Sequence, residues 1–232
     1  MSNEIHIGKQ AAGEVAAKLV HDGMIVGIGT GSTVAYFIEA LGRRIQTEGL
    51  KIQGIPTSEA TVAHATRLGI PLVPLTPQTR PDLTIDGADE ANPKLDLIKG
   101  AGGALVREKL VAAASAEFIV IADSSKRVEQ LGAFPLSLAV VPFAAANLAA
   151  QLKEEFEVTP RLRLQASGEP FVSDDGLFVL DLPFVRIQRP AILDKRLKIL
   201  PGVVETGIFI GLAKRMLLGH PDGRVEAVYP AE

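Results

Sequence analysis

Short apolar segments that alternate with amphipathic ones along the first 121 residues constrain the fold of this chain more than any other feature. The strand-length runs lie at residues 24–28, 52–55, 71–75, 83–85 and 118–121. Helical spacing of apolar residues is found at residues 5–20, 33–45, 58–68 and 104–114. Because strands joined through helices pair in parallel, this order predicts an α/β fold with a parallel sheet that helices cover on both faces.

The pattern changes after Lys126. Strands are expected at residues 136–141, 158–164, 177–182 and 203–210, and helices at 143–156 and 190–199. This β-α-β-β-α-β order is typical of the ferredoxin-like, or split βαβ, arrangement. We therefore predict a small α+β domain at residues 132–203, inserted into a first domain made of residues 1–131 and 204–232. The tail of the first domain is predicted to form a helix at 212–218 and a strand at 224–228.

The composition excludes several classes of protein. The chain has 232 residues and no cysteine, which rules out disulfides, thiolate metal sites and cysteine nucleophiles. Its four histidines are not spaced as a metal-binding pair, and its net charge of −3 includes no basic block that would favour nucleic acid as a partner. No apolar run approaches the ~20 residues needed to cross a bilayer, and no secretory signal is visible. We expect a cytoplasmic protein with no metal and no nucleic-acid or membrane partner.

A glycine-hydroxyl loop at residues 27–33 joins an expected strand to an expected helix. Glycines let the backbone approach a ligand, the helix N-terminus offers free N–H groups, and Thr30, Ser32 and Thr33 add hydroxyl donors. These features predict an anion site. The spacing G-x-G-x-x-S lacks the third glycine of a dinucleotide site, and no lysine follows as in a Walker A loop. A tight turn capped by Ser32 or Thr33 is the structural alternative.

Two carboxylates, Asp86 and Asp89, follow the expected strand at 83–85. At the carboxyl end of a parallel strand, they would face the crevice in which open α/β sheets bind ligands. Carboxylates there can accept hydrogen bonds from sugar hydroxyls or relay protons. A Mg²⁺ or Ca²⁺ site and a solvated turn remain open as alternatives.

Lys99 begins a second glycine-rich loop, and Glu108 lies one turn into the helix that follows it. A partly buried Glu108 could act as a general base, and Lys99 could stabilise a developing oxyanion. Lys126, after the strand at 118–121, could bind a phosphate as a point charge. Taken alone, however, Arg107-Glu108-Lys109 is more typical of an exposed helical turn than of a catalytic site, and an isolated lysine such as Lys126 is usually solvated.

Six segments occur in a fixed order, namely GTGST, PTSEAT, DGADE, KGAGGALVREK, IADSSK and LPGVVETGIF. In this combination the chain resembles ribose-5-phosphate isomerase of the A type, from Gly27 to the tail. The resemblance implies a Rossmann-like parallel-sheet domain with an inserted small ferredoxin-like α+β domain that serves as a lid or in oligomerisation. It also implies a homodimer or homotetramer that interconverts D-ribose 5-phosphate and D-ribulose 5-phosphate, in the pentose phosphate pathway, without a metal or an organic cofactor.

The resemblance also assigns roles to residues. Glu108 would move a proton between C2 and C1 through an enediolate, Asp86 and Asp89 would contact the sugar hydroxyls and help to open the ring, and Lys99 would stabilise the enediolate oxygen. The remaining substrate-binding residues would be Thr30, Gly31, Ser32, Thr33, Gly87, Ala88, Gly100, Ala101, Gly102 and Lys126. Ala101 stands where relatives often carry glycine, and its methyl group requires a negative φ.

The sequence disfavours two alternative functions. Sugar-phosphate-responsive repressors use a similar fold, but the chain contains no helix-turn-helix segment with a basic face. An amino-sugar-phosphate deaminase or a CoA transferase would share the broad fold, but these enzymes carry different motif sets.

Overall fold

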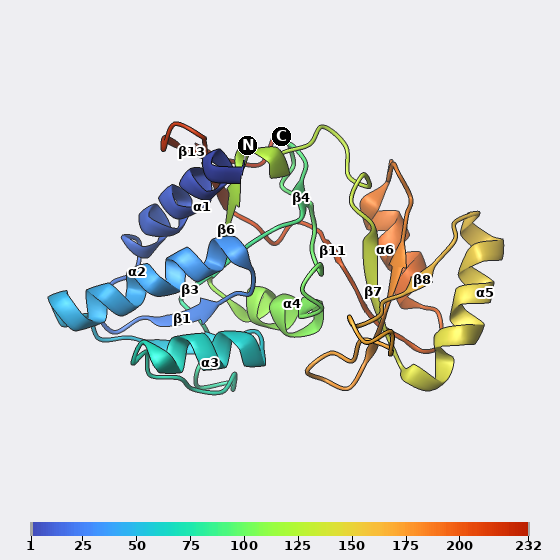
Figure 1. Ribbon diagram of the computed structural model, residues 1–232, viewed down its shortest axis with the longest axis horizontal. Coiled ribbons are helices and arrows are strands. Elements are labelled where there is room, and N and C mark those ends of the chain that lie inside the picture. The colour runs from blue at the N-terminus through green and yellow to red at the C-terminus, as the bar shows by residue number, and fades with distance from the viewer. Residues whose placement is uncertain (1, 232) are drawn as a thin grey trace.

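Six strands form the central sheet of the larger lobe in the computed structural model, which describes residues 2–231 (Figure 1). In spatial order they are β13 (Val225–Val228), β12 (Arg215–Gly219), β6 (Glu117–Asp123), β3 (Leu83–Asp86), β1 (Ile25–Ile28) and β2 (Gln53–Pro56). All neighbours are parallel except β13, which pairs antiparallel with β12. The predicted parallel sheet is confirmed.

Alternate side chains of β6 enter two separate cores. Ile119 and Ile121 pack with the helices α1 (Ser2–Ala17), α2 (Ser32–Glu48) and α3 (Glu59–Arg67). Phe118 and Val120 face the opposite core, to which α4 (Leu105–Ala114) contributes. Because successive side chains of a strand point to opposite faces, this division shows that both faces of the sheet are covered, as predicted.

The smaller lobe is a four-stranded antiparallel sheet with two helices, on the other side of α4 from α2 (Figure 1). Its elements are β7 (Leu136–Val140), η2 (Pro142–Ala144), α5 (Ala145–Phe156), β8 (Arg161–Leu162), β9 (Phe178–Leu182), α6 (Pro190–Lys198) and β10 (Val203–Thr206). The spatial order β10-β7-β9-β8 places β9 between the parallel strands β7 and β8, which is the predicted split βαβ arrangement.

A three-stranded sheet of β11 (Ile208–Phe209), β5 (Leu97–Ile98) and β4 (Glu90–Ala91) links the lobes. Ile98 and Ile208 of this sheet pack into the core of the smaller lobe. The boundaries predicted between the two domains, at residues 131/132 and 203/204, remain a proposal.

Three local predictions were wrong. The expected helix at 212–218 is β12, where Met216, Leu217 and Leu218 are all buried because both faces of the sheet are covered, so the run has no period of two. The expected strand at 71–75 reduces to a single bridge at Leu72, since the prolines on either side of it donate no hydrogen bond. The expected strand at 203–210 is broken at Gly207 into β10 and β11.

The strand order determines where a ligand can bind. The connection from β1 leads to β2 on one side, and the chain then returns to β3 on the other side of β1. Open α/β sheets bind ligands at such a switch point, beyond the carboxyl ends of the strands. The ends of β1, β3 and β6, which are neighbours, carry the glycine-hydroxyl loop, Asp86 and the turn η1 (Ser124–Lys126). Within residues 2–231, none of the helices has the length and apolar character needed to span a membrane.

Candidate active site

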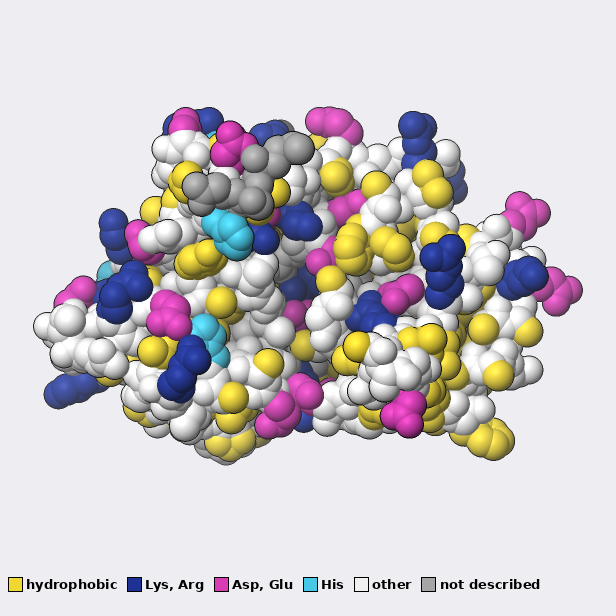
Figure 2. Space-filling model, in the orientation of Figure 1, with side chains coloured by type: hydrophobic (Ala, Val, Ile, Leu, Met, Phe, Trp, Pro, Cys, Tyr) yellow, Lys and Arg dark blue, Asp and Glu magenta, His cyan; other side chains and the backbone are white. Residues whose placement is uncertain are grey.

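A polar cavity of about 280 Å³ opens at the carboxyl ends of β1, β3 and β6. Its lining consists of Lys9, Thr30, Gly31, Ser32, Thr33, Gly87, Ala88, Asp89, Lys99, Gly100, Ala101, Gly102, Glu108 and Lys126. All predicted site residues except Asp86 line this cavity, and Asp86 is fully buried beside Lys99. Figure 2 shows acidic and basic side chains in the depression between the two lobes.

Asp86, Lys99 and Glu108 form a buried charge cluster at the base of this cavity. The Lys99 Nζ lies 3.2 Å from Asp86 Oδ2 and 3.2 Å from Glu108 Oε1, and it donates a hydrogen bond of 2.7 Å to the Gly87 carbonyl. Only 3% of Lys99 and 4% of Glu108 are exposed. Glu108 Oε2 is buried and has no hydrogen-bond partner among the described residues. One ammonium group therefore serves two carboxylates, and one carboxylate oxygen is left free to act on a ligand.

Backbone amides hold Asp86 in place. Its Oδ1 accepts hydrogen bonds from the N–H groups of Thr30, at 3.1 Å, and of Gly87, at 2.7 Å. A Cβ atom at Gly29 would lie 2.2 Å from this oxygen, so only glycine allows the loop after β1 to approach the end of β3 this closely. The glycine at position 29 is therefore needed for the close contact with Asp86, in addition to any contact with a ligand.

Burial and neighbouring charges set the protonation behaviour of the cluster. Burial raises the pKa of Glu108 to about 8, the Asp86 carboxylate adds to this effect, and Lys99 opposes it. Burial also raises the pKa of Asp86 above its ordinary value, against the lowering effect of Lys99 and of the two amides. Although burial favours the neutral amine, the Asp86 and Glu108 carboxylates keep the pKa of Lys99 above its ordinary value. Lys99 is thus a permanent cation, whereas Glu108 can take up and release a proton near neutral pH.

The opposite end of the cavity is suited to an anion. The N-cap of α2 is Gly31, with φ of 129° and no side-chain cap, so the prediction of a cap by Ser32 or Thr33 was wrong. Ser32 is the first residue of the helix, and its hydroxyl accepts a hydrogen bond of 2.9 Å from Lys9 Nζ. Lys126 lines the same cavity from η1. The positive end of the α2 dipole and two ammonium groups therefore meet here.

Lys9 was not predicted, and no local signal could have identified it. It is a single lysine on α1, far from every motif, and only the packing of α1 against α2 brings it to the loop after β1.

The hydroxyl of Thr30 has a different role from the predicted one. It hydrogen-bonds Thr57 at 2.7 Å and Ser58 at 2.8 Å, and it lies 3.2 Å from the Thr61 hydroxyl. This cluster joins the loop after β1 to the start of α3, where Ser58 is the N-cap. Thr30 therefore fixes the shape of the loop and does not offer a free hydroxyl to the cavity.

Asp89 and Ala101 connect the two predicted loops. The Ala101 N–H donates a hydrogen bond of 2.9 Å to Asp89 Oδ2. Ala101 is not among the residues with positive φ, as its methyl group requires. In the described part of the chain, no three His, Cys, Asp or Glu side chains are grouped so that they could hold a metal ion.

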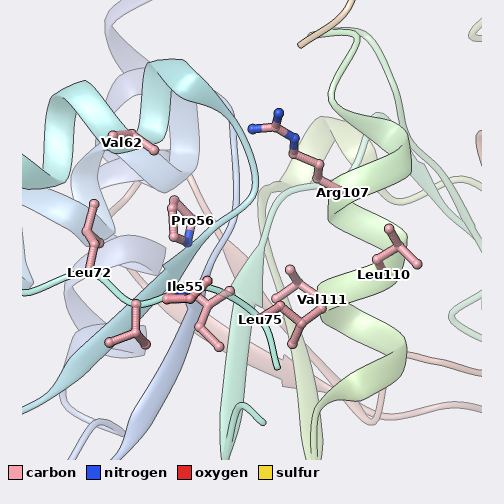
Figure 3. A pocket seen from close by; sticks show the side chains of 10 residues that line it. Ile55, Pro56, Val62, Leu72, Leu75, Arg107, Leu110 and Val111 are labelled. Carbon is pink, nitrogen blue, oxygen red and sulfur yellow. The ribbon is translucent and has the colours of Figure 1, made fainter. Parts of the chain in front are cut away.

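A second hollow, of about 440 Å³, lies between α3 and α4 (Figure 3). Side chains of Ile55, Val62, Leu72 and Leu110, with other apolar groups, make up most of its wall. Its one charged residue, Arg107, already forms ion pairs of 2.8 Å with both Glu59 and Asp175. The single charged side chain of this groove is thus already paired, whereas the polar cavity holds an oxygen without a partner among the described residues, and the polar cavity is therefore the candidate active site.

Comparison with known proteins agrees with this geometry. Residues 53–223 match the family model described as ribose 5-phosphate isomerase A (phosphoriboisomerase A). The chain is 49% identical over 217 residues to ribose-5-phosphate isomerase A of Synechococcus sp. (strain JA-3-3Ab), an alignment that covers 93% of this chain and 94% of that protein. The chain belongs to the ribose-5-phosphate isomerase A family. Enzymes of this family are aldose–ketose isomerases that interconvert ribose 5-phosphate and ribulose 5-phosphate.

Solved structures of ribose-5-phosphate isomerases share the fold over nearly the whole chain. The isomerase A of Methanocaldococcus jannaschii is 39% identical, with a TM-score of 0.90 over 95% of this chain and 97% of that one. A D-ribose-5-phosphate isomerase in complex with phospho-erythronic acid is 35% identical, with a TM-score of 0.91 and the same coverage. The Rossmann-like parallel sheet with a ferredoxin-like unit, predicted for this chain, is thus the fold of the family.

Proposed function

We propose that this chain interconverts D-ribose 5-phosphate and D-ribulose 5-phosphate through an enediolate, with Glu108 as the general base. The observation that carries the proposal is the position of Glu108, a buried carboxylate that lines a polar cavity and keeps one oxygen without a partner among the described residues. In the aldose-to-ketose direction, Glu108 removes the proton from C2 and returns it to C1, while the hydroxyl proton on O2 passes to O1. A single base can serve both carbons because they are adjacent in the planar intermediate.

The charge that develops on the substrate oxygen needs stabilisation by fixed donors. Lys99 supplies a permanent positive charge beside Glu108, and Asp86 keeps the ammonium group in place. Asp89, on the rim of the same cavity, is placed to accept hydrogen bonds from sugar hydroxyls. The side chains around the cavity can fill these roles. We therefore propose that this chain acts on the same sugar phosphates as the family.

The phosphate is assigned to the end of the cavity formed by the α2 N-terminus, Ser32, Lys9 and Lys126. Replacing either lysine with alanine is expected to raise KM by about 10-fold or more, because a hydrogen bond to a charged group contributes about 1.5–3 kcal/mol. The value of kcat should change much less, since the reacting carbons lie at the other end. Steady-state kinetics of both variants, with the variant Lys18→Ala for comparison at an exposed lysine just after α1, provide the measurement. An unchanged KM in both would contradict the phosphate assignment.

The assembly is predicted only by the resemblance, and the location only by the sequence. A homodimer or homotetramer in the cytoplasm, acting in the pentose phosphate pathway, therefore stays a prediction. Light scattering on the purified chain tests the assembly.

The enediolate route is tested by running the reaction in D₂O. Proton NMR should show ribulose 5-phosphate forming from ribose 5-phosphate, with deuterium at C1, because a proton held on a carboxylate exchanges with solvent in at least part of the turnovers. A direct hydride shift would carry the C2 hydrogen to C1 and leave no deuterium there. Failure to form the ketose would contradict the activity itself, and ketose without any deuterium would contradict the enediolate. A parallel reaction with EDTA should run at the same rate if no metal takes part.

A further inference from the structure

A side chain of the smaller lobe reaches into the glycine-rich loop of the active site. Arg163, which follows β8, donates hydrogen bonds from Nη1 to the carbonyl oxygens of Gly100, at 2.8 Å, and Ala101, at 3.0 Å. Both residues line the polar cavity next to Lys99. Arg163 itself does not line the cavity, so it contacts the loop from behind.

Arg163 is held rigidly by groups of its own lobe. Its Nε donates to Asp181 Oδ2 at 2.9 Å, while its Nη2 contacts both Asp181 Oδ1 and, at 2.8 Å, the hydroxyl of Ser137. The guanidinium carbon also lies 5.8 Å from the centre of the Phe171 ring. This two-point contact with a carboxylate fixes the plane of the guanidinium group. The two N–H groups of Nη1 are then left to donate to the carbonyls of the glycine-rich loop.

The contact determines which way the peptide groups of the loop point. The described chain contains no cis peptide bond, so the N–H of Gly102 points opposite to the Ala101 carbonyl that Arg163 binds. Its neighbours are engaged within the loop, since the Ala101 N–H binds Asp89 and the Gly103 N–H binds the Gly100 carbonyl. Among residues 2–231, no group accepts a hydrogen bond from the Gly102 N–H, and Gly102 lines the cavity.

We propose that Arg163 is a positioning residue, which holds the Ala101–Gly102 peptide so that the Gly102 N–H is presented to the substrate oxygen that gains charge in the enediolate. The inference rests on the proposed function, because it concerns the same cavity. The loop needs an external support, since Gly100 (φ of 113°) and Gly102 leave its peptide planes free to rotate. The positive charge on the carbonyl side also polarises the peptide and strengthens its N–H as a donor.

The test compares Arg163→Met with Arg163→Lys and with Arg196→Met. Arg196 is a matched control, because it also forms an ion pair within the smaller lobe, with Glu155, and stacks on a phenylalanine ring, but it is remote from the cavity. For each variant we would measure kcat and KM for ribose 5-phosphate and the inhibition constants of phospho-erythronic acid and of inorganic phosphate. Phospho-erythronic acid carries a carboxylate at the end of the chain that reacts in the sugar, and inorganic phosphate probes only the other end.

We expect Arg163→Met to lower kcat by about 10- to 100-fold, less than the loss of an entire oxyanion donor. Binding of phospho-erythronic acid should weaken by a similar factor, while inorganic phosphate binds as in the wild type. Arg163→Lys should restore part of kcat, because a lysine can still reach the loop carbonyls, and Arg196→Met should match the wild type.

Equal weakening of both inhibitors, or the same loss of kcat in Arg196→Met, would show that Arg163 acts only on the stability of the lobe and would overturn the inference. Thermal unfolding of each variant separates loss of folded protein from loss of rate. If the wild-type chain fails to isomerise ribose 5-phosphate, the proposed function fails; if it succeeds and Arg163→Met keeps its kcat, only the inference about Arg163 fails.

Discussion

Replacing Glu108 with glutamine is expected to lower kcat by about 10³- to 10⁴-fold, because the variant loses the group that moves the proton. Glutamine keeps the size and one acceptor oxygen, so it can still face Lys99 from the position of Glu108, whose Oε1 lies 3.2 Å away. KM should therefore change little, since the phosphate end and the donors around the sugar remain. Steady-state rates of ketose formation, with folding checked by circular dichroism, provide the measurement.

The exposed Glu154→Gln variant on α5 is the control for loss of one carboxylate and should have the wild-type rate. A Glu108→Gln variant that retains more than about a tenth of the wild-type kcat would remove Glu108 from the role of base, given the usual size of such effects.

The pH dependence follows from the raised pKa of Glu108, which burial brings to about 8. A base works only when it is deprotonated, so log kcat/KM of the wild type should rise with a slope of one below about pH 8 and level off above it. An ordinary carboxylate, with a pKa near the usual value of about 4.3, would instead give a flat profile across this range. In Glu108→Gln the residual activity should lose this rising limb.

The sequence predicted most of the residues that line the candidate site, because many of them follow strands. Asp86 and Asp89 stand directly after an apolar run, and the carboxyl ends of neighbouring parallel strands share one edge of the sheet. The proposed roles of these residues come from the resemblance carried by the ordered motifs. The tail was mispredicted, because a strand buried on both faces, such as β12, has no alternation that distinguishes it from a helix.

Residue patterns alone could not predict that Glu108 is buried. Arg107, Glu108 and Lys109 are consecutive on α4, so their side chains leave the helix in three directions. Arg107 pairs with Glu59 and Asp175, Lys109 pairs with Glu205 at 2.7 Å, and Glu108 alone turns to the cavity. Glu108, which would be exposed on an isolated helix, is buried here because α4 lies between the two lobes (Figure 1).

Lys9 and Arg163 escaped prediction for a related reason. Both reach the site from elements that are distant in sequence, and nothing in their neighbourhood marks them. Tertiary packing, which local patterns do not encode, brings them to the loops.

Replacing Lys99 with methionine removes the single cation that serves two buried carboxylates. Methionine has a similar length and shape, so the main change is electrostatic. Asp86 and Glu108 would then share a proton, because two carboxylates in one low-dielectric site resist simultaneous ionisation. Removal of one partner from a buried ion pair also costs about 3–5 kcal/mol of unfolding free energy.

We expect kcat/KM of Lys99→Met to fall by about 10²- to 10³-fold, because the enediolate oxygen loses its charged donor. The rising limb of its pH profile should also move above pH 8, since Lys99 lowers the pKa of Glu108 in the wild type.

Lys109→Met is the matched control, because Lys109 is a largely buried lysine paired with Glu205 that does not line the cavity. That variant should lose stability but keep the pH profile of the wild type. If the rising limb of the pH profile stays near pH 8 in Lys99→Met, Lys99 does not control the ionisation of Glu108. If the two lysine variants lose the same factor in kcat/KM, Lys99 has only a structural role.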